Sequence, residues 1–163
     1  MVVRIFLWDM ISPYSQLLFT GIRYILLKSM IKECGDNVIV AKNVVVKNWK
    51  NLSIGKNVSI HPNCYIDALG NIIIGNDVSI AHNTSILSFE HTWENSELPI
   101  KYNELQLKST IIDDNVWIGC GCRILGGVKI ASRSIIAAGA VINKSNVSDT
   151  IYAGIPGKLI KKI

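Results

Sequence analysis

Isoleucine recurs at a fixed spacing along most of this chain. Between Val116 and Lys144 it stands at every sixth position, and the same phase continues upstream through Ile112. Two shorter blocks keep this spacing, at residues 54–66 and 74–86. The anchor positions are Ile54, Ile60, Ile66, Ile74, Ile80, Ile86, Ile112, Ile118, Ile124, Ile130, Ile136 and Ile142. A period of six matches neither the 3.6-residue period of a helix nor the alternation of a single strand.

This period predicts a β-solenoid, because six residues form one face of a triangular prism and three faces form one coil. Each isoleucine then points inward and stacks on the isoleucine of the neighbouring coil. A smaller side chain stands four residues after the anchors, near a corner of the prism. These positions are Val58, Cys64, Val78, Thr84, Val116, Cys122, Val128, Ser134, Ala140 and Asn146. Gly, Asn and Asp residues suit the corners, since they tolerate positive φ. The predicted fold class is an all-β solenoid.

Breaks in the repeat divide the chain into a helical cap, a solenoid and a basic C-terminal tail, at residues 1–35, 36–150 and 151–163. Within the solenoid, the segment 51–60 matches 71–80 at six of ten positions, so one early coil is twenty residues long. The phase is lost at residues 92–111, a polar stretch that we interpret as one excursion loop. Insertions in solenoids project from one face and often carry binding function.

The N-terminal segment shows the apolar spacing of a helix from Pro13 onward, with Leu17 and Ile22 among its apolar positions. One interpretation is a helix that covers the open end of the prism, because a solenoid must protect its terminal edge. The other is a basic amphipathic helix that makes peripheral contact with a membrane, since Arg23 and Lys28 lie elsewhere around the helix. The longest uncharged stretch is too short to span a bilayer.

Composition narrows the class of ligand. The chain has 163 residues, 49% of them hydrophobic, and a formal net charge of +5, which predicts one domain with a sufficient core. No dense basic run with interleaved aromatic residues occurs, which argues against nucleic acid. The charge favours a phosphorylated small ligand or, alternatively, a merely solvated basic surface. The four cysteines, Cys34, Cys64, Cys120 and Cys122, lack metal-type spacing, and reduced thiols predict a cytoplasmic protein.

Three strings in a fixed order are more specific than the repeat. They are "IGNDVSIAHNTSILSFEH" from Ile74, "DDNVWIGCGCRILGGVKIASRSIIAAGAVINK" from Asp113, and "AGIPGKLIKKI" at the C-terminus. With them the chain resembles the hexapeptide-repeat acyltransferases, and within these the sugar and polysaccharide O-acetyltransferases such as the maltose and galactoside enzymes. The resemblance covers residues 50–163. It implies a left-handed parallel β-helix, acetyl-CoA as co-substrate, and a homotrimer with its sites between subunits.

The resemblance makes His91, at the entrance of the excursion loop, the general base. A sugar hydroxyl is a weak nucleophile, and its attack on a thioester needs its proton removed as the bond forms, a task that suits an imidazole. The alternative is an ordinary loop histidine. Glu90 or Glu94 would orient the ring, and the sequence favours neither.

The other two histidines, His61 and His82, lie within repeat faces, and we interpret them as structural. Three histidines are the right number for zinc. Their separations are twenty-one and nine residues. The zinc carbonic anhydrases of this solenoid type have a different pattern, with two histidines five residues apart. We therefore expect no metal.

The resemblance also assigns binding residues. Asn63 and Asp67 would lie near the acceptor hydroxyl, although Asn63 would equally suit a corner. The residues expected to bind acetyl-CoA are Trp117, Cys120, Ala138, Asn143, Lys144, Lys158 and Lys161. The first three would line the pantetheine slot, where Trp117 is alternatively an ordinary wall residue. Asn143 replaces a threonine of the family pattern, and Lys158 and Lys161 replace two arginines, which keeps the charge but loses the fork geometry.

These assignments predict an acetyl-CoA-dependent O-acetyltransferase that acts on a sugar or surface-polysaccharide precursor. The hydroxyl would attack the acetyl thioester directly, with no covalent enzyme intermediate. One alternative is N-acetylation of an amino sugar or a nucleotide-linked amino sugar. The alternative from another class is a non-catalytic hexapeptide scaffold, which would not bind CoA.

Overall fold

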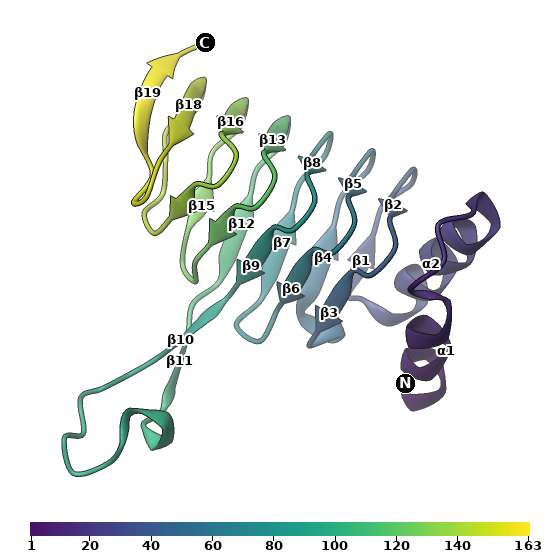
Figure 1. The fold of residues 1–163 in the computed structure, drawn as a ribbon, viewed down its shortest axis with the longest axis horizontal. Coiled ribbons are helices and arrows are strands. Elements are labelled where there is room, and N and C mark those ends of the chain that lie inside the picture. The colour runs from purple at the N-terminus through teal and green to yellow at the C-terminus, as the bar shows by residue number, and fades with distance from the viewer.

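The structure is a computed structural model that describes residues 1–163, and it forms a β-solenoid with two helices at one end (Figure 1). Three sheets form the faces of the prism, and their strands run parallel except for β19, which is antiparallel to β18. Sheet A contains β1 (Glu33–Cys34), β4 (Leu52–Ile54), β7 (Ile72–Ile74), β12 (Thr110–Ile112) and β15 (Lys129–Ile130). Sheet B contains β2 (Ile39–Val40), β5 (Ser59–Ile60), β8 (Ser79–Ile80), β13 (Val116–Ile118), β16 (Ser134–Ile136), β18 (Thr150–Ala153) and β19 (Lys158–Lys162). Sheet C contains β3 (Val45–Lys47), β6 (Tyr65–Asp67), β9 (Ser85–Leu87), β14 (Arg123–Ile124) and β17 (Val141–Ile142).

The predicted anchors are the core of the prism. All twelve isoleucines are buried, none exposed by more than 2%, and the smaller residues that follow them are buried as well. Strand pairing stacks anchor on anchor, as in the column Ile54, Ile74, Ile112 and Ile130. Each buried isoleucine contributes roughly 1.5–3 kcal/mol. The predicted solenoid with inward isoleucines is therefore confirmed.

Coil length changes along the prism. Ser59 pairs with Ser79, twenty residues further on, whereas Val116 pairs with Ser134, only eighteen further on. The first coil likewise has two residues more than an eighteen-residue coil, and its 3₁₀ helix η1 (Trp49–Asn51) accommodates them. The corner between sheets B and C is one column of residues with positive φ, namely Asn43, Asn63, Asn83, Gly121 and Gly139. The expectation that Asn and Gly form the corners is met at every coil of this column.

The excursion is a hairpin arm that leaves the prism between β9 and β12 (Figure 1). Its antiparallel strands are β10 (Phe89–His91) and β11 (Leu105–Leu107), and the 3₁₀ helix η2 (Ile100–Tyr102) lies near its tip. The arm departs and returns slightly earlier than the expected loop at 92–111. The reason is that Thr110 pairs with Ile72 and its hydroxyl donates to the carbonyl of Leu87, 2.7 Å away, which brings the chain back into sheet A.

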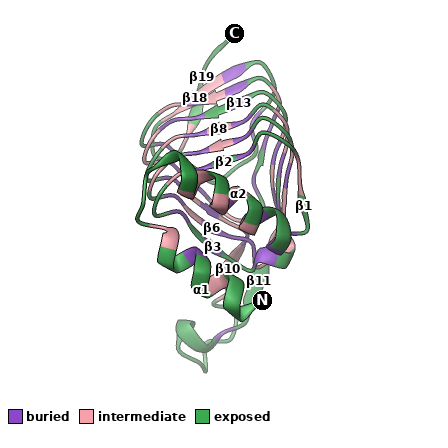
Figure 2. Ribbon diagram, turned by 90° about the vertical axis from the view of Figure 1, so that its right-hand side faces the viewer, coloured by how far each residue is buried: buried purple, intermediate pink, exposed green.

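Both ends of the prism are covered. At the N-terminal end lie α1 (Val2–Ile11) and α2 (Leu17–Met30), which bury Trp8, Leu27 and Met30 against the first coil (Figure 2). The sequence spacing indicated a helix only from Pro13, so α1 is an additional element. At the other end, the basic tail folds back as β19 on β18 and extends sheet B.

Candidate active site

His91 is the last residue of β10, at the root of the hairpin arm. It pairs with Leu105 of β11, and its exposed side chain makes no hydrogen bond with any other group of the chain. The next residue fastens the two strands, because both the amide and the hydroxyl of Thr92 donate to the carbonyl of Glu104, at 3.0 and 2.9 Å. The imidazole is therefore carried on an ordered backbone, while its own nitrogens bond to no other group of the chain.

The root of the arm is held by Ser88, which is fully buried. Its hydroxyl donates to the carbonyl of Asp67 at 2.8 Å and accepts the amide of Gly70 at 2.9 Å. Its carbonyl accepts the amide of Lys108 at 2.8 Å, which closes the other strand of the arm. Gly70 is required at this point, because a Cβ there would overlap the Ser88 carbonyl oxygen. These contacts fix the position of His91 relative to the second coil.

Neither carboxylate near His91 in the sequence bonds to it. Side chains alternate along a strand, so Glu90 projects from the face of the hairpin opposite to His91. There it forms an ion pair with Lys108 at 2.6 Å. Glu94 lies beyond β10 and lines a hollow with Thr92 and Glu90, on that same side. Within one chain, the orientation of His91 comes from the backbone alone.

Asp67 lies at the end of β6, directly below the root of the arm, and is 8% exposed. The amide of Asn48 donates to one of its carboxylate oxygens at 2.7 Å, and the hydroxyl of Tyr65 donates to the other at 3.3 Å. Burial, followed by the nearby Asp67 charge, raises the pKa of Tyr65, so Tyr65 remains a donor. Asn63 lies instead at the opposite end of β6, at the corner between sheets B and C, with φ of 60°. The structure separates the two residues expected to hold the acceptor.

Trp117 lies on the outer face of sheet B and is 54% exposed. Pairing continues its row through Ile135 and Ile151 to Lys161 on β19. Lys158 pairs with Ala153, two residues beyond Ile151, and therefore projects from the same face. Three strand spacings separate Trp117 from Lys161, about 14 Å. One flat face thus carries an aromatic ring and two cations.

A shallow hollow of about 330 Å³ adjoins this row. Its lining includes Trp117, Ile135, Ile163 and the exposed cation Arg133. Arg133 stands at a corner with φ of 52° and donates to Asp149 at 2.7 Å. The sequence did not indicate this cation, because Asn or Asp fills the same corner position in the other coils. Only the pairing of β13 with β16 places Arg133 beside Trp117.

Cys120 and Ala138 lie in successive coils at the corner between sheets B and C. The amide of Gly139 donates to the Cys120 carbonyl at 2.8 Å, and a Cβ on Gly119 would lie 2.6 Å from the amide nitrogen of Ala138. The two turns are therefore in close contact. The adjacent Cys122 is fully buried, and burial raises the pKa of its thiol, so this sulfur is not poised as a nucleophile.

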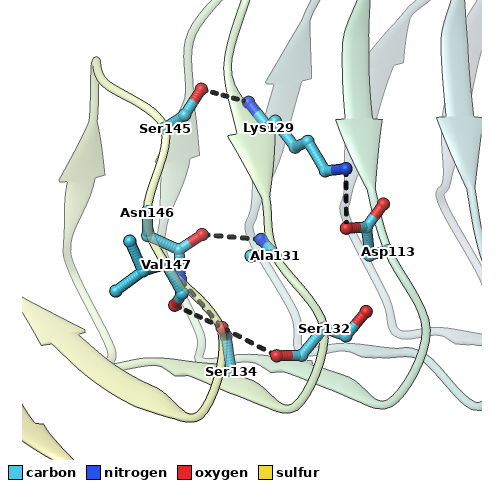
Figure 3. A network of polar contacts seen from close by, with 8 residues as sticks. All are labelled: Asp113, Lys129, Ala131, Ser132, Ser134, Ser145, Asn146 and Val147. Carbon is cyan, nitrogen blue, oxygen red and sulfur yellow. Dashed lines mark hydrogen bonds and ion pairs between the residues drawn. The ribbon is translucent and has the colours of Figure 1, made fainter.

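Asn143 and Lys144 follow β17 and are exposed at the corner between sheets C and A, the corner from which the arm departs two coils earlier. Polar contacts hold the turn that follows them (Figure 3). Asn146, 8% exposed, accepts the amide of Ala131 at 2.7 Å and donates to the Ser134 hydroxyl at 2.8 Å. Lys144 is thus carried on an ordered turn.

The three histidines lie apart. His61 directly follows β5 and His82 lies two residues after β8, both near the corner between sheets B and C, whereas His91 belongs to the arm at another corner. No group of three or more His, Cys, Asp or Glu side chains is arranged to hold a metal ion.

One chain divides the expected site residues among three places. His91, Asp67, Asn143 and Lys144 lie along the corner between sheets C and A. A second group, Asn63, Cys120 and Ala138, lies along the corner between sheets B and C. A third group, Trp117, Lys158 and Lys161, lies on the outer face of sheet B. A ligand that touches the first and third groups together would need more than one copy of the chain.

Comparison with known proteins agrees with this architecture. Residues 109–144 match the family model described as bacterial transferase hexapeptide (six repeats). A hexapeptide-repeat acetyltransferase of Vibrio cholerae O1 biovar eltor, solved in complex with acetyl coenzyme A, superposes with a TM-score of 0.85 at 25% sequence identity, covering 98% of this chain and 84% of that chain. The fold and the repeat thus define a transferase of the left-handed β-helix class, as the sequence predicted.

Sequence relatives assign the family within this class. The galactoside O-acetyltransferase of Escherichia coli is 32% identical over 138 residues, 85% of this chain and 67% of that protein. The Saccharomyces cerevisiae protein YJL218W, described as an acetyltransferase with no acceptor stated, is 33% identical over 137 residues, 84% of this chain and 69% of that protein. The chain therefore belongs to the hexapeptide-repeat acetyltransferases and is an acyltransferase. Relatives that match about a third of it include an N-acetyltransferase of Staphylococcus aureus, 42% identical over 52 residues.

Proposed function

We propose that the protein transfers acetyl from acetyl-CoA to a hydroxyl of a sugar or surface-polysaccharide precursor in the cytoplasm. The observation that carries this proposal is His91, an exposed imidazole with unoccupied nitrogens on the ordered root of the arm. A hydroxyl acceptor needs a base at this position to remove its proton. Asp67, held by Asn48 and Tyr65, supplies a fixed carboxylate beside the arm for the sugar hydroxyls.

His91 acts as the general base in a direct transfer. It accepts the hydroxyl proton as the oxygen attacks the acetyl carbonyl, so that an O–C bond forms. The C–S bond then breaks, and the CoA thiolate leaves with a proton returned by the imidazolium. Cys122 and Ser88 are buried and engaged in hydrogen bonds, which supports transfer without an acyl-enzyme intermediate. A backbone N–H of the Cys120 turn is suited to stabilise the oxyanion.

Acetyl-CoA binding is proposed for the outer face of sheet B and its neighbouring corner. Trp117 and the contacting turns of Cys120 and Ala138 form a narrow wall for the pantetheine arm. Lys158 and Lys161 extend from the same face and would meet the phosphates, together with Lys144 and the amide of Asn143 from the arm corner of a neighbouring copy. These residues are exposed, which suits a ligand that lies along the prism rather than inside it.

The active unit is proposed to be a threefold trimer with each site between two subunits. The division of the expected residues among two corners and one face supports this arrangement. A rotation about an axis parallel to the prism brings the arm corner of one copy against the acetyl-CoA face of the next. The exposed apolar side chains of the arm, among them Trp93 and Leu107, would contact the neighbouring prism.

The proposal is tested with the purified protein, acetyl-CoA and a panel of sugars and amino sugars, by following thiol release. The linkage of the product is then probed with hydroxylamine, which cleaves an acetyl ester and leaves an acetyl amide intact. We expect release that depends on a hydroxyl acceptor and a hydroxylamine-sensitive product. Release with amine acceptors only, giving a resistant product, would contradict the proposal.

The second candidate is N-acetylation of an amino sugar or nucleotide-linked amino sugar, favoured by the N-acetyltransferase relatives. The same hydroxylamine assay separates it from O-acetylation. Both transferase functions require the protein to bind CoA, which a titration measures.

A further inference from the structure

The outward side of the N-terminal helices is apolar. On α1, the residues Val2, Val3, Phe6, Leu7 and Met10 are exposed by 42–81% and lie on one side of the helix, opposite Trp8. On α2, Leu17 and Leu18 are exposed by 87% and 70%. We call these seven residues the cap face. Figure 2 shows both helices exposed across the end of the molecule that faces the viewer.

The helices already pack on the prism through the side opposite the cap face. The indole of Trp8 donates to the carbonyl of Val44 at 3.1 Å and meets Trp49 edge to face, with ring centroids 5.0 Å apart. The guanidinium of Arg23 is fully buried and donates to the carbonyl of Val40 at 2.8 Å and to two carbonyls at the turn between the helices. These bonds fix which side of α1 faces the prism. The opposite side therefore remains exposed in the folded chain.

The charge beside the cap face favours an anionic partner. Asp9 is the only acidic residue of α1 and α2, and Arg4 within α1 and Lys32 after α2 are exposed cations, whereas Lys28 is paired with Asp36 at 3.0 Å. A second copy placed face to face would bring cation against cation, which is unfavourable. An anionic lipid surface is complementary in both charge and polarity. Neither helix has the length and apolar content that a bilayer crossing requires.

We propose that the cap face docks on an anionic phospholipid bilayer, with α1 and α2 lying in the plane of the interface. This role is separate from acetyl transfer and needs no acceptor. Covering the first coil does not require an apolar outward side on residues 1–30, and membrane docking gives that side a function. In the proposed trimer, three cap faces would lie at the same end of the assembly and bind one membrane together, which multiplies a weak single contact.

The test is flotation of the full-length protein with vesicles. Equal parts of phosphatidylcholine and phosphatidylglycerol are compared with phosphatidylcholine alone. We expect binding to the anionic vesicles that weakens in high salt. The double variant F6S/M10S should lower the partition coefficient at least about tenfold, because two exposed apolar side chains lose their contact with lipid. The matched control is V147S, whose valine is 56% exposed outside the cap.

Three results would overturn the proposal. They are no binding of the wild-type protein to anionic vesicles, equal binding by F6S/M10S, or lipid-free pairing through the cap face, seen as a doubled mass in sedimentation that F6S/M10S abolishes. The variant L17S/L18S is tested in parallel, and thermal unfolding confirms that each variant is folded. No arm of the test uses acetyl transfer, so its failure is distinguishable from failure of the proposed function.

Discussion

His91 and Glu90 are neighbours in the sequence but project from opposite faces of the hairpin arm. Glu90 is committed to Lys108, 2.6 Å away, while His91 has no partner in its own chain. In many general bases a carboxylate orients the imidazole. Here the paired strands of the arm and the buried Ser88 hold the backbone of His91, the proposed base. The difference leads to a prediction about the carboxylate.

We predict that Glu90→Gln leaves the turnover number within about threefold of the wild-type value, because the side chain points away from the base. The ion pair is partly exposed, so its loss should lower the free energy of unfolding by no more than about 1 kcal/mol. Steady-state kinetics and denaturant unfolding measure the two effects. A loss of turnover near a hundredfold would mean that Glu90 reaches a histidine after all, in the same or a neighbouring chain.

Residue positions were predictable from the sequence where the repeat specifies them. The twelve isoleucine anchors follow from their period alone, because any one-residue slip would move an anchor out of the core. The direction of Glu90 was not predictable. It depends on which residues of the arm pair, and β10 and β11 are only three residues long and lie outside the six-residue repeat. Arg133 was missed for a related reason, since its neighbours come from other coils.

At the scale of elements, the root of the arm is the joint between the solenoid and the strand that carries His91. Ser88, which follows β9, is joined to Asp67 of β6, to the turn at Gly70 and to Lys108 after β11 by three hydrogen bonds of 2.8–2.9 Å. The backbone at Gly70 approaches this joint so closely that no side chain fits. Any displacement there would be carried along β10 to His91.

We predict that Gly70→Ala lowers the free energy of unfolding by about 1–3 kcal/mol, because the added Cβ overlaps the Ser88 carbonyl and lies 2.8 Å from the Lys108 amide nitrogen. The matched control is Gly21→Ala within α2, where nothing lies within 4 Å of the new atom. That control should raise the free energy of unfolding by up to about 1 kcal/mol through helix propensity. Denaturant unfolding of both variants checks the pair, and equal stability of the two would contradict this description of the joint.

Elements that belong to the repeat were predicted better from the sequence than elements outside it. The prism and the position of the excursion follow from six-residue phasing. Helix α1 lacks the polar face that marks an ordinary surface helix, because Trp8 packs inward while Phe6 and Met10 face outward. The C-terminal tail is rich in lysine, yet it pairs with β18, since the last coil would otherwise leave an open sheet edge.

At the scale of the whole molecule, a single prism does not bring the base and the proposed acetyl-CoA face together. His91 belongs to the arm at the corner between sheets C and A, whereas Trp117 lies on the outer face of sheet B. The proposed shared site would account for the exposure of each group in the single chain. It also makes a quantitative prediction about mixed assemblies.

We predict that an inactive His91→Ala chain and an inactive K158E/K161E chain recover activity when they are co-assembled. In a trimer of randomly mixed chains, about a quarter of the sites would combine an intact base with an intact acetyl-CoA face. Thiol release after co-expression in equal amounts, compared with mixtures of separately assembled variants, measures the recovery. Co-assembled chains as inactive as their parents would place the complete site within one chain.

The most direct test of the catalytic assignment compares wild type with His91→Ala in acetyl transfer, at acetyl-CoA concentrations matched to a separate binding titration. Because the imidazole is exposed and bonded to nothing in its own chain, the variant should fold and bind acetyl-CoA as the wild type does. We predict that its turnover with a hydroxyl acceptor falls by about 10²- to 10⁴-fold. Turnover that stays at the wild-type level would contradict the assignment of His91 as the general base.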